Sequence, residues 1–138
     1  MGNNGENNWN VGYGGISFFE QVLSNHSSVD SFVRTNEIQF IITRSKGMSQ
    51  VNAVLVDIYM LGEAAHHAIL SEFPGVTSIV NNGNWNHIAY DSRKVAKQTG
   101  VETFLMRKFL GALNCNDFSK YILADERKKT TKRIRKTS

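Results

Sequence analysis

The sequence has little of what ties a small fold together by covalent or metal bonds. It contains a single cysteine, Cys115, which excludes an internal disulfide and leaves no second cysteine for a zinc-knuckle spacing. No apolar run approaches the roughly 18 residues of a membrane span. The start, MGNNGENNWNVGYGG, lacks the basic and apolar regions of a signal peptide. We therefore expect an intracellular protein without a membrane partner, cytoplasmic or, in a eukaryote, nuclear, with Cys115 buried or half-buried.

Two common kinds of ligand site are also missing. Gly12, Gly14 and Gly15 precede an expected helix but follow no strand, and they lack the Lys-Ser/Thr of a P-loop. His66 and His67 are adjacent on an expected helix, so they point about 100° apart and do not form the i, i+4 pair that a metal prefers. We expect these histidines at the surface or its boundary.

Length and composition indicate one globular domain with low-complexity ends. The chain has 138 residues and is 41% hydrophobic, which suits a single core. Its start interleaves glycines with asparagines, and such a segment cannot bury enough apolar surface to offset the entropy of ordering. We expect a disordered arm over 1–13, a single α/β domain over 14–124 and a basic disordered tail over 125–138.

The net charge of +4 is unevenly distributed. Seven basic residues and no acid lie in the last twelve positions: Arg127, Lys128, Lys129, Lys132, Arg133, Arg135 and Lys136. Residues 1–126 hold the other nine basic and all twelve acidic side chains, so this part carries about −3. We expect the tail to contact nucleic-acid phosphates by counterion release. A solubilising terminus and a nuclear-targeting signal are the alternatives.

Hydrophobic periodicity gives the order of elements. Ile16, Phe19 and Leu23 share one face of a helix, and the segments around SKGMSQ alternate as an antiparallel hairpin does. In chain order, the pattern predicts a helix over 16–24, strands over 37–44 and 51–60, a helix over 61–73, a strand over 76–80 and a helix over roughly 87–99 ended by Gly100.

Residues 93–113 allow two interpretations. RKVAKQTGV fits a helix-turn-helix, in which the following segment would be the recognition helix of a DNA-binding regulator. Phe104 and Leu105 would then fall where polar, base-reading side chains are needed. A strand over 101–106 and a helix over 107–113 is the preferred interpretation, and it predicts an α/β fold whose mixed sheet combines an antiparallel hairpin with parallel strands flanked by helices.

This order of elements resembles the restriction-endonuclease-like (PD-(D/E)XK) superfamily, in particular its Mrr-like branch, over about 100 residues. GGISFFEQVL is similar to the family's opening helix, with Glu20 at its glutamate. EIQFII and VLVDIYM are similar to its two active-site strands, with Gln39 at the metal-binding aspartate, Asp57 at the acidic or amide position and Tyr59 at the lysine. VTSIVNNGNWNHIAYDSRKVAKQTGVETFLMRKFLGAL is similar to the rest of the core.

The departures from this pattern imply a degenerate site. Such nucleases use two carboxylates to hold magnesium beside a lysine, whereas Gln39 is an amide and Tyr59 is neutral at pH 7. Asp57 alone would be a weak metal ligand. The resemblance implies a module that binds nucleic acid or a protein partner. It implies no catalysis and no cofactor. The alternative is a divergent magnesium-dependent nuclease that uses Asp57 with Glu20 or Glu37 and Lys46 as a displaced lysine.

The loop over 81–87, NNGNWNH, is the other candidate site. It leaves the carboxyl end of an expected strand and enters a helix, a position that commonly binds ligands. Asn84 and Trp85 would supply hydrogen bonding and stacking to nucleic acid. The alternative is a capped turn in which Trp85 covers the core. A homodimer is also open, although no sequence feature requires one.

Overall fold

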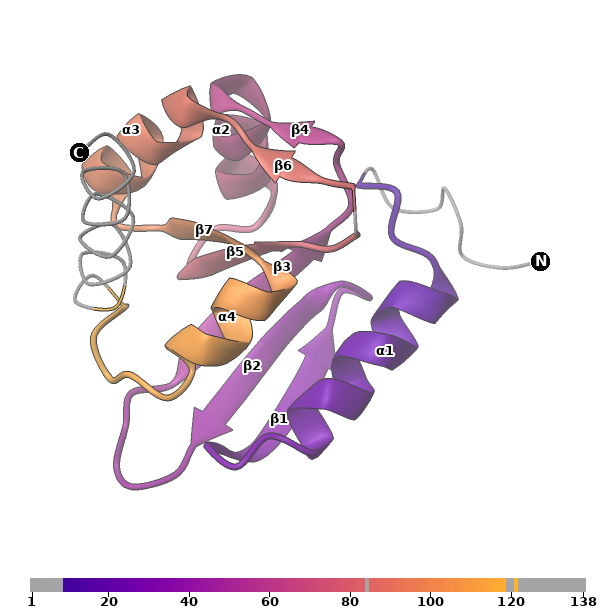
Figure 1. The fold of residues 1–138 in the computed structure, drawn as a ribbon, viewed down its shortest axis with the longest axis vertical. Coiled ribbons are helices and arrows are strands. Elements are labelled where there is room, and N and C mark those ends of the chain that lie inside the picture. The colour runs from indigo at the N-terminus through magenta and orange to yellow at the C-terminus, as the bar shows by residue number, and fades with distance from the viewer. Residues whose placement is uncertain (1–8, 84, 119–120, 122–138) are drawn as a thin grey trace, which may run out of the picture.

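The fold was described from a computed structural model, which places residues 9–83, 85–118 and 121. The elements in chain order are α1 (Tyr13–Ser24), β1 (Val29–Thr35), β2 (Gln39–Arg44), β3 (Val51–Val56), β4 (Met60–Leu61), α2 (Glu63–Glu72), β5 (Ser78–Asn81), β6 (His87–Ile88), α3 (Tyr90–Thr99), β7 (Glu102–Leu105) and α4 (Met106–Ala112) (Figure 1). None of the helices in the described part of the chain has the length and apolarity needed to cross a membrane.

Five strands form a mixed sheet in the order β1-β2-β3-β5-β7. The first three pair antiparallel, and β3, β5 and β7 run parallel. The short β4 and β6 make a separate two-stranded parallel ribbon. The expected α/β class with an antiparallel hairpin and parallel strands is confirmed. Because 102–105 is a strand paired with β5, the helix-turn-helix alternative is wrong.

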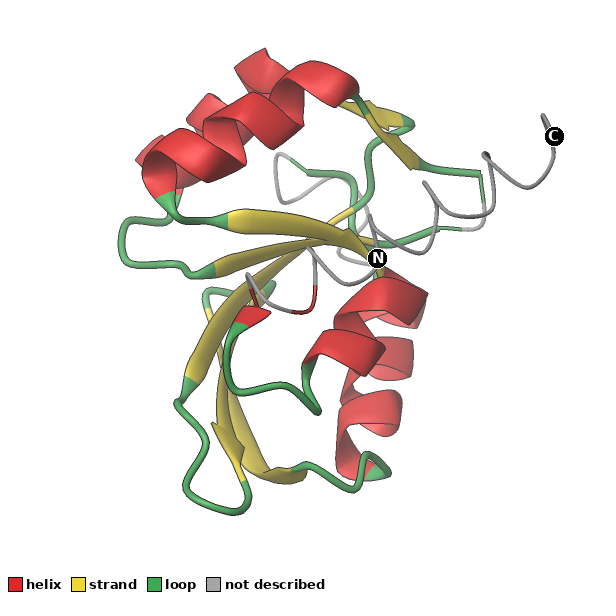
Figure 2. Ribbon diagram, turned by 60° about the vertical axis from the view of Figure 1, so that its left-hand side comes forward, coloured by secondary structure: helices red, strands yellow, loops and turns green. Residues whose placement is uncertain are grey.

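Helices lie in two groups on opposite sides of the strongly twisted sheet (Figure 2). Phe19 of α1 meets Phe40 of β2 edge-on at 4.8 Å, and Phe109 of α4 packs on Phe104 of β7 at 5.7 Å, so α1 and α4 share one face. On the other side, α2 packs beside α3, and α3 lies against β7. These rings are at most 1% exposed and form the centre of the core.

Several predicted features are confirmed. Ile16, Phe19 and Leu23 are the buried residues of α1, as their spacing indicates. Gly100 ends α3 in the left-handed conformation with φ 78°, which glycine adopts without steric cost. Cys115 is half-buried and unpaired.

Other boundaries were wrong. Strand β1 was missed, residues 57–59 are not strand, and 87–88 form β6 where a helix was expected. The arm boundary at residue 13 is too late, because Val11 is 1% exposed and the N–H of Asp57 donates to the Trp9 carbonyl at 3.0 Å. The two-residue strands β4 and β6 form only because they pair with each other across the chain, so no local sequence pattern predicts them.

The guanidinium of Arg44 ties the hairpin to the segment that follows α4. Its five hydrogen bonds go to oxygens of Ser49, Leu113, Cys115 and Asn116, at 2.8 to 3.4 Å, and it lies 5.2 Å from the Phe118 ring centre. Arg44 is 4% exposed. Burial lowers its pKa, which still leaves a cation at neutral pH because arginine starts so far above it. This cation is balanced by carbonyl dipoles.

His66 is fully buried, so its expected place at the surface is wrong, whereas His67 is exposed. Ala64 and Ala68 on the same helix are exposed. Nδ1 of His66 lies 2.9 Å from the Ser92 hydroxyl on α3. Nε2 lies near the Val101 backbone without a hydrogen bond of good geometry. The imidazole therefore joins α2 to α3 as a neutral core group.

We expect stability to fall in mild acid because of His66. Burial, with a smaller effect of His67, lowers the pKa of His66 below its ordinary value, against the opposing effects of Ser92 and of the Val101 backbone. The unfolded chain then binds the proton more readily, so the stabilisation is complete above pH about 6.5 and is lost as the pH falls toward the lowered pKa. His66→Asn should flatten the fall in unfolding free energy between pH 7.5 and 5.5, measured by urea denaturation. His67→Asn is the control, and equal slopes for all three proteins would contradict this assignment.

Candidate functional site

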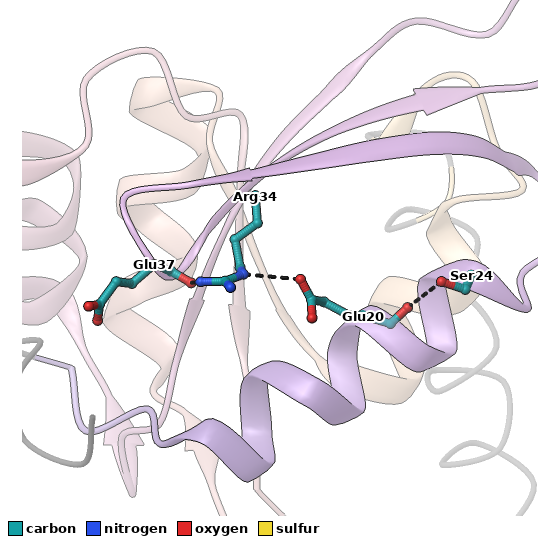
Figure 3. A network of polar contacts seen from close by, with 4 residues as sticks. All are labelled: Glu20, Ser24, Arg34 and Glu37. Carbon is teal, nitrogen blue, oxygen red and sulfur yellow. Dashed lines mark hydrogen bonds and ion pairs between the residues drawn. The ribbon is translucent and has the colours of Figure 1, made fainter. Parts of the chain in front are cut away.

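Glu20 is held in a surface ion pair. Its Oε2 lies 3.0 Å from Nε of Arg34 on β1, and both side chains are more than a third exposed. Nη1 of Arg34 donates to the backbone carbonyl of Glu37 at 3.2 Å, while the Glu37 carboxylate points away from Glu20 (Figure 3). The Glu20 carboxylate thus attaches α1 to the β1–β2 turn.

Gln39 belongs to a chain of amides. It is 8% exposed on β2, where Nε2 donates to Oδ1 of Asn52 at 2.9 Å and Oε1 accepts from Asn36 at 3.2 Å. Asn52 continues the chain to the Gly75 carbonyl. Gln39 is paired with Val54, three residues before Asp57, so it lies about 10 Å back along β3.

Asp57 lies at the carboxyl end of β3, beside the end of β5. Its Oδ1 accepts a hydrogen bond from Nδ2 of Asn86 at 2.6 Å, and the same amide nitrogen donates to the Asn82 carbonyl. Gly83 leaves the space for this contact. A Cβ there would lie 2.6 Å from Nδ2 of Asn86, and the φ of 118° is one that other residues rarely adopt.

Asn81, at the end of β5, has no exposed surface and organises this edge. Its Oδ1 accepts from the N–H of Ile58 at 2.9 Å, and its Nδ2 donates to the carbonyls of Ile58 and His87 at 2.8 and 3.2 Å. One side chain thus joins the main sheet to the segment that precedes β4 and to the start of β6. The sequence pattern indicated Asn81 only as part of a loop and gave it no role.

The residues expected to form a nuclease centre have separate partners. Glu20 binds Arg34, Gln39 binds Asn52 and Asp57 binds Asn86, whereas Tyr59 is 68% exposed. Among residues 9–83, 85–118 and 121, no three His, Cys, Asp or Glu side chains are placed to hold one metal ion. Lys46 follows β2, whereas Glu37 precedes it, so about 20 Å of strand separates them. The displaced-lysine arrangement is therefore wrong.

Exposed aromatic side chains gather around the β4–β6 ribbon. Tyr59, Trp85 and Tyr90 are 68%, 81% and 80% exposed, and Tyr59 meets the His87 ring edge-on at 5.6 Å. We call Tyr59, Trp85, His87 and Tyr90 the aromatic edge. The alternative in which Trp85 covers the core is wrong, because its side chain is largely in solvent. Asn84 and the seven basic tail residues lie outside the described residues.

A cavity of about 530 Å³ opens at the other end of the parallel strands, where they begin. Val51 and Glu102, the first residues of β3 and β7, line it together with Thr77, which precedes β5. Arg44 lines it, but protein oxygens accept hydrogen bonds from each nitrogen of its guanidinium. This cation is therefore engaged in the fold and is poorly placed to recognise an anion. The edge that carries Asp57 and the aromatic side chains is the stronger candidate.

Comparison of the chain with protein-family models, curated proteins and solved structures finds no significant match.

Proposed function

We propose that this chain is a nucleic-acid-binding module on a nuclease-like α/β fold without catalysis. The aromatic edge contacts the nucleic acid, and the basic tail adds phosphate contacts. The observation that carries the proposal is the exposure of Tyr59, Trp85 and Tyr90 on and around the β4–β6 ribbon, which follows Asp57 and the carboxyl end of the parallel strand β3. Open α/β sheets bind ligands at this end.

The surroundings of Asp57 support binding rather than hydrolysis. Magnesium requires octahedral oxygen ligands, of which carboxylates are the strongest. Here Nδ2 of Asn86 donates to Oδ1 of Asp57, and in the described part of the chain no group of three His, Cys, Asp or Glu side chains is placed to hold the ion with it. In this arrangement the residues do not fit the metal ion that the family resemblance implies. Asp57 instead fixes the loop that presents Trp85.

The tail supplies the charge that the folded part lacks. Its seven cations follow a body of about −3, so long-range attraction to phosphates must come chiefly from the tail. Exposed Tyr and Trp side chains are also common at protein interfaces, so the rings alone do not distinguish the two kinds of partner. The seven tail cations favour nucleic acid, because they complement its phosphates. Nucleic acid offers both phosphates and flat bases.

The full chain should bind DNA or RNA oligonucleotides and leave them intact with magnesium or manganese present. Replacing all seven tail cations with glutamine should weaken binding and flatten its salt dependence, by about 0.7 to 0.9 in the log–log slope for each phosphate that the tail no longer neutralises. Fluorescence anisotropy and gel electrophoresis measure the two properties.

Two outcomes would count against the proposal. If the full chain fails to bind any oligonucleotide at low salt, binding as its function is wrong. If it cleaves nucleic acid and Asp57→Asn abolishes that cleavage, the chain is a divergent metal-dependent nuclease, and the absence of catalysis is wrong.

A further inference from the structure

The β4–β6 ribbon holds its outward side chains in a fixed frame. Met60 is paired with His87 and Leu61 with Ile88, and the N–H groups of His87 and Ala89 donate to the Tyr59 and Leu61 carbonyls at 2.7 and 2.8 Å. Leu61 is fully buried, which directs Met60, on the alternate side of the strand, outward to 50% exposure. The aromatic edge therefore rests on hydrogen-bonded backbone.

The exposed rings lie close together along the chain. Tyr59 touches His87, Trp85 lies two residues before His87, and Tyr90 begins α3 three residues after it. Five peptide units separate Trp85 from Tyr90, which sets an upper limit of roughly 17 Å between their Cα atoms. At about 3.4 Å for each stacked nucleotide of one strand, a backbone span of that length corresponds to no more than about five nucleotides.

Cations continue from the aromatic edge along α3. Lys94 places its Nζ 6.0 Å from the Tyr90 ring centre, and Lys97 follows one turn later, so Tyr90, Lys94 and Lys97 lie along one exposed stripe. Two carboxylates next to these rings in the sequence, Asp91 and Asp57, accept hydrogen bonds within the fold. Oδ1 of Asp91 accepts the N–H of Glu63 at the start of α2, and Oδ1 of Asp57 accepts from Asn86. A strand stacked on the rings would find its phosphates beside the lysines.

We propose that the aromatic edge is a stacking platform for the unpaired bases of single-stranded nucleic acid. This inference rests on the proposed function and narrows its substrate class. Every base has a flat face, so stacking tolerates sequence. In a duplex those faces are covered by neighbouring bases, which makes single strands and unpaired loops the ligands that exposed rings can reach. The platform therefore prefers single-stranded to double-stranded nucleic acid. The tail attracts the phosphates of both.

The test uses the full chain with an oligo-dT strand of about ten nucleotides, a length within the range one stacking domain covers, and a duplex of equal length. In a Trp9→Phe background, Trp85 is the one tryptophan left. We expect the single strand to bind more tightly than the duplex and to quench Trp85 fluorescence. Trp85→Ala and Tyr59→Ala should each weaken single-strand binding roughly 5- to 100-fold. Tyr59→Phe, which keeps the ring, should bind as the parent does.

Phe18→Ala is the matched control, since Phe18 is an exposed ring, 48% accessible, on α1. It should leave binding unchanged. If the chain binds single strand and duplex equally and the ring variants have no effect, the platform is wrong while the proposed function stands. If no oligonucleotide binds, both are wrong. If the ring variants instead dissociate an oligomer seen by sedimentation, the edge is a protein interface and the inference is overturned.

Discussion

Arg44→Met is expected to lower the free energy of unfolding by about 3 to 5 kcal/mol, because it leaves buried oxygens without their donors. Methionine keeps most of the side chain's volume and removes the fork of N–H groups. The carbonyls of Leu113 and Cys115 then lack the cation that holds the end of α4 against the hairpin. The ring of Phe118 is left without the guanidinium that lies against it. Urea denaturation followed by circular dichroism measures the change.

Arg34→Met is the control for this prediction. Arg34 lies on the neighbouring strand β1, but its pair with Glu20 is exposed to solvent, and pairs of that kind contribute about 1 kcal/mol or less. Arg44→Lys should recover only part of the loss, because an ammonium has three donors on one nitrogen and cannot span both sides of the site. Equal destabilisation by Arg34→Met and Arg44→Met would mean that Arg44 does not hold the segment after α4.

Asn81→Asp is expected to destabilise the fold by about 2 to 4 kcal/mol at pH 7, despite an almost unchanged shape. One carboxylate oxygen can still accept the N–H of Ile58. The other would replace the amide nitrogen that now donates to the carbonyls of Ile58 and His87, and would face two acceptors. A buried carboxylate in this position favours its protonated form. The loss should therefore be smaller at pH 4 than at pH 7, relative to the parent protein at each pH.

The effect should also be local. Hydrogen exchange should accelerate at the N–H groups of His87 and Ala89, which bond the β4–β6 ribbon, more than at β2 and β3. Asn25→Asp provides the comparison, because the exposed amide of Asn25 bonds one carbonyl at the end of α1. If Asn81→Asp were no more harmful than Asn25→Asp, the ribbon would be held by other contacts.

Elements with a strong local signal could be predicted from the sequence. The spacing of Ile16, Phe19 and Leu23 encodes the buried face of α1, and Gly100 can end α3 because it alone adopts its φ easily. Strand β7 followed from the poor fit of Phe104 to a base-reading helix, and it is buried beside β5. In each case the residue type and the structural demand coincide within a few positions.

What could not be predicted depends on tertiary contacts. Strand β1 exposes most of its residues, with Val33 61% accessible at the sheet margin, so it lacks the apolar alternation of an inner strand. His66 looked like a surface residue because its partner, Ser92, lies 26 positions away. The role of Asn81 depends on where Ile58 and His87 meet. Asparagine after a strand usually indicates a turn. A single sequence contains no pattern that separates a turn asparagine from one that, like Asn81, bonds two distant backbone segments.

The contacts of Arg44 also set an order of events during synthesis. The carbonyls that its guanidinium binds after α4 lie 69 to 72 residues later in the chain. At roughly 5 to 20 residues per second, between about 4 and 14 s of translation separate the two. Within that interval the acceptors of Arg44 beyond α4 are not yet made, so a nascent chain halted there lacks the contacts that join the β2–β3 hairpin to the segment after α4. Completion of the domain is therefore tied to the ribosome's passage beyond Asn116.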